Sequence, residues 1–288
     1  MTGRLVTVGN ALVDVVAAVP RLPERGGDVL ATGGRLEVGG GGFRALVAAR
    51  AAGADAVYGG RIGRGPYADL VRRALAAHGI PAPLPPVADR DTGSALAMVE
   101  PDGERTFVTI PGAESADPGL DALLLEPGDH LHVHGYGLVA RGRGAAVARF
   151  VTGLPAEVPV LLDPGPFGAD AAPEVLADLL PRIDWWSGNA AEARAATGLG
   201  DAEAAARLLA GTARRGAVVR LGAEGCILAV RGSALVLLPG PAVVAVDTNG
   251  AGDTHVGTFL AALLAGAEPV AAAQAATEAA ARFVATPR

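Results

Sequence analysis

The segment Asp247–His255, "DTNGAGDTH", brings small residues and a carboxylate together at one point of the chain. It follows an apolar run at 242–246, which predicts a strand, and it precedes apolar residues that recur at helical spacing up to Gly266. The helix is therefore expected to begin within Gly250–Asp253. A glycine-rich junction of this kind has two chemical interpretations.

In the first interpretation the junction is an ordinary strand-to-helix turn, and Asp253 caps the helix. In the second, the free N–H groups of the first helical turn and the positive end of the helix dipole bind an anion, which glycine allows to approach the backbone closely. A carboxylate beside such a site suits transfer of a phosphoryl group to a hydroxyl. The amides stabilise the transferring group, and Asp253 takes the hydroxyl proton.

The elements that must position this junction can be read from the rest of the chain. Short apolar runs rich in Val, Ile and Leu alternate with alanine-rich stretches. This alternation predicts an α/β fold with a central, mostly parallel sheet sandwiched by helices. The 288 residues, of which 50% are apolar, suffice for one such domain. The expected strands are 4–9, 55–60, 130–135, 158–163, 183–188, 217–222 and 226–230, and the expected helices are 44–53, 66–79, 143–153, 173–181, 190–198 and 202–216.

Two segments, 11–38 and 91–110, interrupt the alternation. In the second, Asp102-Gly103 separates two alternating runs, and this dipeptide is a strong signal for a hairpin turn. We expect the two segments to form a small β-sheet that lies over the α/β core. The alternative is a pair of edge strands within the main sheet.

Charge and composition exclude several classes of protein. The net charge of −6 argues against an extended nucleic-acid footprint, and no apolar run reaches the length of a membrane span, about 20 residues. All 24 basic residues are arginine, which excludes a Walker A loop, a protein-kinase catalytic lysine and Schiff-base chemistry. The single cysteine, Cys226, is expected to be an inert core thiol. The N-terminal residues do not form a signal-peptide pattern, so a cytoplasmic protein is expected.

The whole segment 247–266 is similar to the C-terminal signature of the ribokinase-like, or PfkB, family of carbohydrate kinases. The resemblance implies one ribokinase-like kinase domain over residues 1–288, with a lid formed by 11–38 and 91–110. It extends in order along nearly the whole chain. The other matching stretches are 6–16 for the first strand, 38–53 for the N-terminal glycine-rich signature, 92–107 for the lid hairpin, 189–192 for the Asn-x-x-Glu motif and 220–225 for the nucleotide-binding loop.

The resemblance also implies an activity and roles for individual residues. The protein would be an ATP-dependent phosphotransferase that moves the γ-phosphate to a hydroxyl of a sugar or sugar-like molecule, with ATP and Mg²⁺ as cofactors. Asp253 would be the catalytic base, and Gly250, Ala251 and Gly252 would form the anion hole. The other implied contacts are Asp14, Gly40, Gly41 and Arg44 for the acceptor, Asn189, Glu192, Arg220, Gly222, Gly225 and Thr248 for the nucleotide, and Asn189 and Glu192, through water, for the magnesium ion.

One position departs from the family pattern. Where the glycine-rich signature usually carries an asparagine that binds an acceptor hydroxyl, this chain has Arg44. In one interpretation the guanidinium holds a phosphate or carboxylate of an anionic acceptor. In the other it pairs with Asp14 and narrows the pocket. The alternatives to a sugar kinase are a nucleoside or phosphosugar kinase and a non-catalytic ribokinase-like protein that binds a ligand.

The positions of several histidine and tryptophan side chains can also be predicted. His130, His132 and His134 alternate along one strand, so they share a face and either hold a metal or lie near the acceptor pocket. His255 is expected to line the site or to face solvent. The pair Trp185–Trp186 is expected to pack in the core, with the two rings on opposite faces of a strand.

The lid segments are also expected to provide a contact between subunits. Their strands cannot bury both faces and all edges within a lid of this size, and uncovered β-structure seeks a partner. The sequence therefore predicts a homodimer formed through the lid. The other expected partner is the small-molecule acceptor, and neither nucleic acid nor a membrane is expected to bind.

Overall fold

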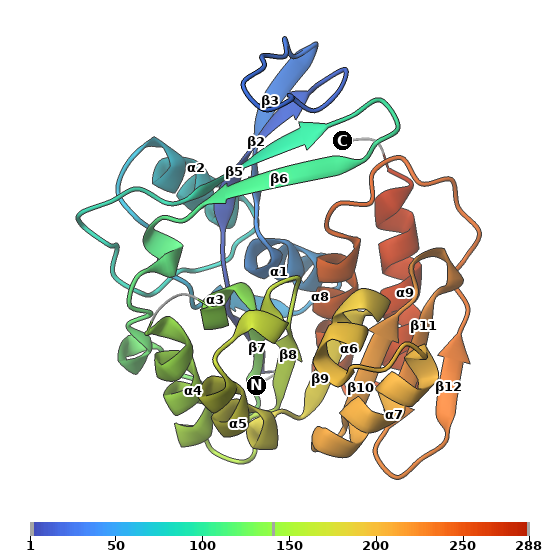
Figure 1. Ribbon diagram of the computed structural model, residues 1–288. Coiled ribbons are helices and arrows are strands. Elements are labelled where there is room, and N and C mark those ends of the chain that lie inside the picture. Colours follow the sequence, from blue (N-terminus) through green and yellow to red (C-terminus); the bar gives the residue numbers. More distant parts are fainter. Residues whose placement is uncertain (1–2, 140–141, 287–288) are drawn as a thin grey trace.

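A mostly parallel sheet forms the centre of the computed structural model, which describes residues 3–139 and 142–286 (Figure 1). Within these residues the sheet has eight strands in the order β12-β11-β10-β9-β8-β7-β1-β4. The strands from β10 to β4 pair in parallel, and β11 and β12 are antiparallel additions at one edge. The strands are β1 Arg4–Val8, β4 Asp55–Tyr58, β7 His130–His134, β8 Val160–Asp163, β9 Trp185–Asn189, β10 Gly216–Arg220, β11 Cys226–Val230 and β12 Leu235–Leu238.

Helices cover both faces of this sheet, which confirms the predicted α/β sandwich. Apolar side chains of α4, α5, α6 and α7 join one core cluster, and those of α1, α2, α8 and α9 join the other. Trp185 and Trp186 are buried in opposite clusters, as predicted. None of the helices in the described ranges is long and apolar enough to cross a bilayer. The helices are α1 Gly41–Ala51, α2 Pro66–Ala77, α3 Tyr136–Val139, α4 Arg143–Gly153, α5 Pro173–Leu179, α6 Ala190–Thr197, α7 Ala202–Thr212, α8 Ala251–Leu264 and α9 Pro269–Val284.

The two interrupting segments form a separate four-stranded sheet, in the order β3-β2-β5-β6, which projects over one end of the core (Figure 1). The prediction of a small sheet is therefore confirmed, and the alternative of edge strands in the main sheet is wrong. The predicted hairpin turn at Asp102-Gly103 joins β5 to β6, and Gly103 has a left-handed φ of 87°. The strands are β2 Leu12–Ala18, β3 Gly33–Gly39, β5 Ser94–Val99 and β6 Arg105–Ile110.

The strand predicted at 242–246 is wrong. These residues form an exposed connection between the edge strand β12 and α8, and Val244 is 85% exposed. Its described backbone bonds run from Val246 N and Asp247 N to the carbonyl of Val284 at the end of α9. A short apolar run therefore did not distinguish a sheet strand from a connection that crosses outside the sheet.

Helices α1 and α8 approach each other so closely that only glycine fits at their contact. A β-carbon at Gly257 of α8 would overlap the carbonyl oxygen of Ala45 in α1. Both helices begin at a glycine with a left-handed backbone, Gly40 with φ 95° and Gly250 with φ 89°. The two glycine-rich segments of the sequence are thereby brought together at one end of the sheet.

Candidate active site

The N-terminus of α8 falls where the sequence predicted, but its cap is Gly250. Asp253 lies in the first turn, and no side chain caps the helix. The interpretation of Asp253 as an ordinary helix cap is therefore wrong. Ala251 donates its N–H to the carbonyl of Thr248 at 3.2 Å, which tightens the turn. The carboxylate is left beside the positive end of the helix dipole.

Two arginine side chains flank this turn. A β-carbon at Gly250 would lie 2.9 Å from Cδ of Arg44, and one at Gly252 would lie 3.3 Å from Nη2 of Arg220. The two glycines thus allow side chains from α1 and β10 to reach the helix end. An anion bound at the first turn of α8 would lie between two guanidinium groups, each able to donate charge-assisted hydrogen bonds.

On the side of α1, Arg44 forms an ion pair with Asp14 of β2 at 2.9 Å and lies 3.4 Å from Glu37 of β3. The Arg44 side chain is 13% exposed, so the pair is largely removed from water. Burial raises the pKa of Asp14, and the opposing effect of Arg44 does not cancel this rise. Of the two interpretations of Arg44, the structure contains the ion pair with Asp14. At Gly41, a β-carbon would overlap the imidazole of His134, which brings β7 to the same place.

On the side of β10, Arg220 lies among three oxygen-bearing side chains. It donates to Oγ of Ser187 at 2.9 Å and lies 3.3 Å from Glu192 and 3.5 Å from Asp163. Asn189 and Glu192 form a reciprocal capping box at the start of α6, with hydrogen bonds of 2.8 Å and 2.7 Å. The Asn-x-x-Glu motif therefore has a structural role here besides the predicted role toward nucleotide and magnesium.

The remaining residues predicted to contact the nucleotide lie in turns near this edge of the sheet. Gly222 and Gly225 open and close a tight turn after β10, with φ of 63° and 98°. Thr248 is exposed in the loop before α8.

Sequence reasoning missed Asp163, and it named His134 only as one of three histidines on a strand near a metal or the acceptor pocket. Both are buried at the carboxyl ends of neighbouring parallel strands, β8 and β7. Ligand atoms of His134, Asp163 and Asp253 all lie within 4.8 Å of one another. Two carboxylates therefore lie beside the last histidine of the strand. The usable signal was position, since functional side chains of parallel sheets gather at the carboxyl ends of the strands.

The pKa values of the two neighbouring carboxylates, Asp253 and Asp163, shift in opposite directions. Burial raises the pKa of Asp253, and the charge of Asp163 adds to this, while His134, Arg44 and Arg220 oppose it. For Asp163 burial acts the same way, but Arg220, followed by His134 and His132, outweighs it and lowers the pKa. Asp163 is thus the stable anion, and Asp253 is the carboxylate that accepts a proton more readily.

Other histidines and the cysteine lie outside this cluster. His132 contacts Oγ1 of Thr7 through Nδ1 at 3.3 Å, inside the sheet. His255 is 4% exposed and faces Thr277 of α9, with Nε2 3.4 Å from Oγ1. The expectation that His255 faces solvent is therefore wrong. Cys226 is buried beside Thr277, and burial raises the pKa of its thiol, which confirms an inert core thiol.

The small sheet is tied to the core at its tip and at its root. At the tip, Nη2 of Arg105 in β6 lies 2.7 Å from Asp247 in the loop that leads to α8. At the root, the buried carboxylate of Glu114 accepts hydrogen bonds of 2.8 Å from the N–H groups of both Gly93 and Gly112. These glycines precede β5 and follow β6, so one side chain holds both connections.

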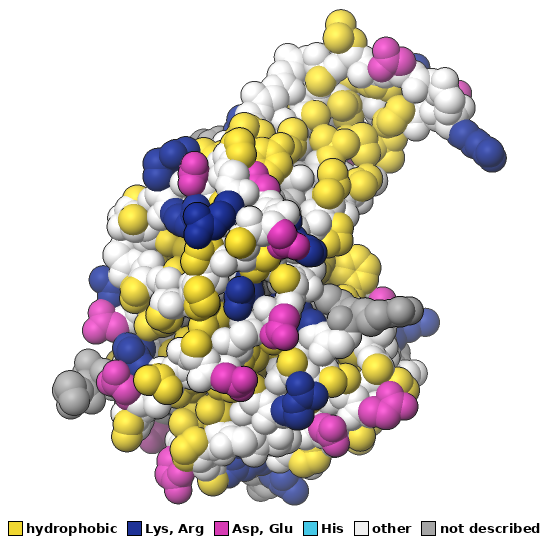
Figure 2. All heavy atoms as spheres, turned by 90° about the vertical axis from the view of Figure 1, so that its left-hand side faces the viewer, with side chains coloured by type: hydrophobic (Ala, Val, Ile, Leu, Met, Phe, Trp, Pro, Cys, Tyr) yellow, Lys and Arg dark blue, Asp and Glu magenta, His cyan; other side chains and the backbone are white. Residues whose placement is uncertain are grey.

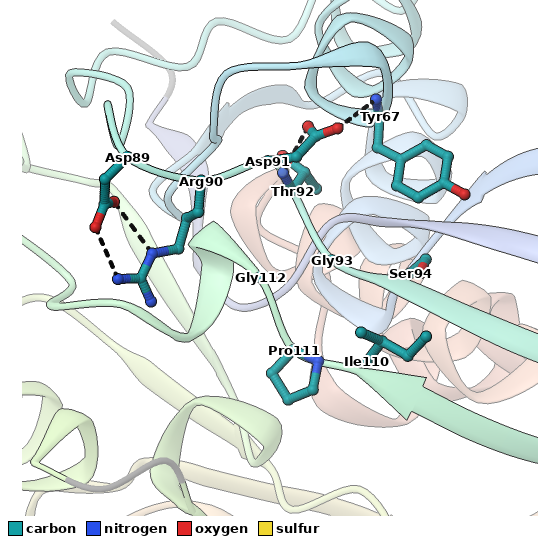
Figure 3. A pocket seen from close by; sticks show the side chains of 10 residues that line it. All are labelled: Tyr67, Asp89, Arg90, Asp91, Thr92, Gly93, Ser94, Ile110, Pro111 and Gly112. Atoms are coloured by element: carbon teal, nitrogen blue, oxygen red, sulfur yellow. Dashed lines mark hydrogen bonds and ion pairs between the residues drawn. The ribbon is translucent and has the colours of Figure 1, made fainter.

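Two hollows adjoin the small sheet. Figure 3 shows the first, a cavity of 460 Å³ at the root, where Asp91 accepts the N–H of Tyr67 at the start of α2. Its lining comes from the connections of the small sheet, from Ser94 and Ile110 of its strands and from Tyr67 of α2. The second, of 590 Å³, is lined by residues of β3, α1, α8 and α9, among them Glu37 and Arg44. Figure 2 shows the small sheet projecting from the body of the molecule over a recess.

An α/β core covered by a small sheet, with a glycine-capped helix that presents a carboxylate in its first turn, is the architecture of a small-molecule kinase. The chain belongs to the pfkB family of carbohydrate kinases, whose model matches residues 2–287. This confirms the resemblance seen in the sequence and the assignment as a carbohydrate kinase.

Individual relatives agree with this membership. The chain is 32% identical over 278 residues to the uncharacterized sugar kinase YegV of Escherichia coli (strain K12), covering 91% of this chain and 82% of that protein. It is 30% identical over 282 residues to a ribokinase of Arabidopsis thaliana, covering 91% and 71%. The structure of Arabidopsis thaliana ribokinase complexed with ribose and ATP matches with a TM-score of 0.82 at 26% identity, over 100% of this chain and 94% of that one. An adenosine kinase from Sinorhizobium meliloti shares the fold, with a TM-score of 0.83 at 20% identity over 99% and 95%.

We expect Asp253→Asn to stabilise the fold at neutral pH. A raised pKa in the folded state means that ionised Asp253 costs stability once the pH exceeds that pKa, whereas below the ordinary value of 3.8 the acid is protonated in both states. Asparagine mimics the protonated form, so the variant should melt a few degrees higher at pH 7, where about 1 kcal/mol corresponds to roughly 2–4 °C. The gain should shrink toward acidic pH in calorimetric scans.

Asp163→Asn is the matched control, because the pKa of Asp163 is lowered and its ionised form is the stabilising one. This variant should melt below the wild type at pH 7. Equal shifts of the same sign in both variants would contradict the opposite electrostatic roles of the two carboxylates.

Proposed function

We propose that the protein transfers the γ-phosphate of ATP to a hydroxyl of a sugar or sugar-like molecule. The observation that carries this proposal is the carboxylate of Asp253 in the first turn of α8, beside glycine backbone and between Arg44 and Arg220. The ribokinase relative whose structure holds ribose and ATP supports both the donor and the class of acceptor. We place the reaction in the cytoplasm, where ATP is supplied.

In this mechanism Asp253 removes the proton of the acceptor hydroxyl as the new phosphorus–oxygen bond forms and the bond between the β- and γ-phosphates breaks. Its raised pKa brings the carboxylate nearer to the working pH, which favours general-base catalysis. The backbone of Gly250, Ala251 and Gly252 stabilises the charge on the transferring group, and Arg220 approaches the same point.

Asn189 and Glu192 fit a water-mediated magnesium site only in part. The capping box occupies Oδ1 of Asn189 and Oε2 of Glu192, and the latter also lies 3.3 Å from Arg220. Oε1 of Glu192 is the oxygen that these contacts leave for a water bound to Mg²⁺. The ion would neutralise phosphate charge when bound, while Gly222, Gly225 and Thr248 would border the nucleotide.

The acceptor would lie under the small sheet, against Asp14, Gly40 and Gly41. We propose that segments 11–38 and 91–110 act as a lid of a single kinase domain, which excludes water that would compete as acceptor. The contact of 2.7 Å between Arg105 and Asp247 supports this role, since it joins the lid to the loop that carries the anion hole.

A neutral acceptor is the better supported choice. Asp14 and Glu37 already neutralise Arg44, so the guanidinium is not an uncompensated charge awaiting an anion. A nucleoside or a phosphosugar as acceptor and a non-catalytic ligand-binding protein are the alternatives.

The test is turnover of ATP with Mg²⁺ against a panel of neutral sugars, nucleosides and phosphosugars. We expect ADP release that depends on a neutral sugar, and Asp253→Asn should lower kcat by roughly 10²–10⁴ while the nucleotide still binds. Acceptor-dependent turnover at the wild-type rate in this variant would contradict the mechanism. Ligand binding without any turnover across the panel would favour the non-catalytic alternative.

The variant Arg44→Asn tests the charge of the acceptor. Because Arg44 is neutralised by two carboxylates, we expect the ratio of KM values for a phosphorylated and an unphosphorylated sugar to change by less than about threefold. Loss of a charge-assisted contact to an anionic acceptor would instead raise the KM for the anion by about tenfold or more. That second outcome would show that Arg44 selects a phosphorylated or carboxylated substrate.

We also propose that the protein forms a homodimer through the outer face of the lid. Asp14 and Glu37 face the site, so their neighbours in the strands face away from it. On that outer face Leu36, Val108 and Ile110 are 56%, 52% and 57% exposed, and Figure 2 shows hydrophobic side chains along the projecting sheet. Val15 and Leu96 lie between Leu36 and Val108 in one row of paired residues across the four strands.

Light scattering at micromolar concentration should therefore give the mass of a dimer, and Val108→Glu should give the mass of a monomer. Leu124→Glu is the matched control, since Leu124 is 80% exposed but lies outside the small sheet, in the connection that leads to β7. A monomeric wild type, or a variant at Val108 that remains dimeric, would exclude this interface.

A further inference from the structure

The cluster of His134, Asp163 and Asp253 has the composition of a metal site that differs from the proposed magnesium contact at Glu192. It offers one imidazole nitrogen and two carboxylates, whose ligand atoms lie within 4.8 Å of one another. A point among three such atoms can lie within about 2.8 Å of all of them, so shifts of about 0.7 Å would give the ligand distances of Zn²⁺.

The imidazole of His134 is held in place but is not satisfied by hydrogen bonds. Its ring stacks on Tyr136 with a centroid distance of 5.3 Å and an interplanar angle of 7°, and Gly41 and Gly165 pack against its edge. The side chain is 4% exposed, and Nδ1 is buried without a hydrogen-bond partner among the described residues. A buried polar atom of this kind is costly unless a ligand completes it.

The charges around the cluster also call for a cation. Asp163, Asp253 and Glu192 converge there. Arg220 is shared between Asp163 and Glu192, and Arg44, which flanks the same turn, is paired with Asp14 and Glu37. Arg220 is 3.5 Å from Oδ2 of Asp163, a weak contact, whereas Oδ1 accepts the N–H of Gly165 at 3.0 Å. Oδ2 is therefore the oxygen that can turn to a metal ion.

We propose that His134, Asp163 and Asp253 bind a divalent transition-metal ion, with Zn²⁺ and Mn²⁺ preferred to Mg²⁺. The imidazole nitrogen sets this preference, because Mg²⁺ favours sites made wholly of oxygen. Three protein ligands leave positions open for water or for a phosphate oxygen. An ion held there occupies the carboxylate of Asp253, so saturating Zn²⁺ inhibits any reaction that uses this residue as a base.

Binding is measured by calorimetric titration of the full chain with ZnCl₂, MnCl₂ and MgCl₂, without nucleotide or acceptor. This readout does not depend on the proposed kinase reaction. We expect Zn²⁺ to bind more tightly than Mg²⁺, and His134→Gln and Asp163→Asn each to weaken Zn²⁺ binding by about tenfold or more. His130→Gln, which removes an imidazole from the other end of β7, is the matched control and should bind Zn²⁺ as the wild type does.

A second measurement needs no variant. Mn²⁺ bound to the wild type should show coupling to an imidazole nitrogen in pulsed electron paramagnetic resonance. Unchanged Zn²⁺ affinity in a folded His134→Gln variant overturns the proposal, and so does equal weakening in His130→Gln. Mn²⁺ binding without imidazole coupling would place the ion elsewhere and overturn it as well.

Discussion

The close contact between α1 and α8 is the constraint on which the site depends. Because Gly257 lets α8 settle against the backbone of α1, the N-termini of both helices meet at one end of the sheet. Each terminus begins with a left-handed glycine, and each carries one charged side chain inward, Arg44 from α1 and Asp253 from α8. If the two helices were further apart, Arg44 and Asp253 would no longer lie at the same place, whatever the sequences of the loops that precede the helices.

The basic side chains that offset the carboxylates at this meeting point are arginines, since the chain contains no lysine. Arg44 and Arg220 each lie against more than one carboxylate, which leaves neither as an isolated buried charge. Planar guanidinium groups suit this arrangement because one group can face two carboxylates at once. Arg220 favours the ionised form of Asp163, while burial makes Asp253 the readier proton acceptor.

The features that could be predicted from the sequence are local ones. The helix start at Gly250, the hairpin at Asp102-Gly103 and the alternation of strands and helices each depend on neighbouring residues. His134 and Asp163 approach Asp253 only because β7 and β8 are adjacent in the sheet, and that order is set by the whole fold. The strand expected at 242–246 failed for a related reason, because apolar composition does not reveal whether a neighbouring strand is present to pair with it.

Glu114 gives the small sheet a mechanical property. Its carboxylate holds the amide groups of Gly93 and Gly112, where the chain enters β5 and leaves β6. One of these connections cannot swing without pulling the other through a buried carboxylate, and β5 pairs directly with β2. Any tilt of the small sheet would therefore carry β5 and β6 together with β2, so the four strands would move as one plate about their root rather than as two independent hairpins.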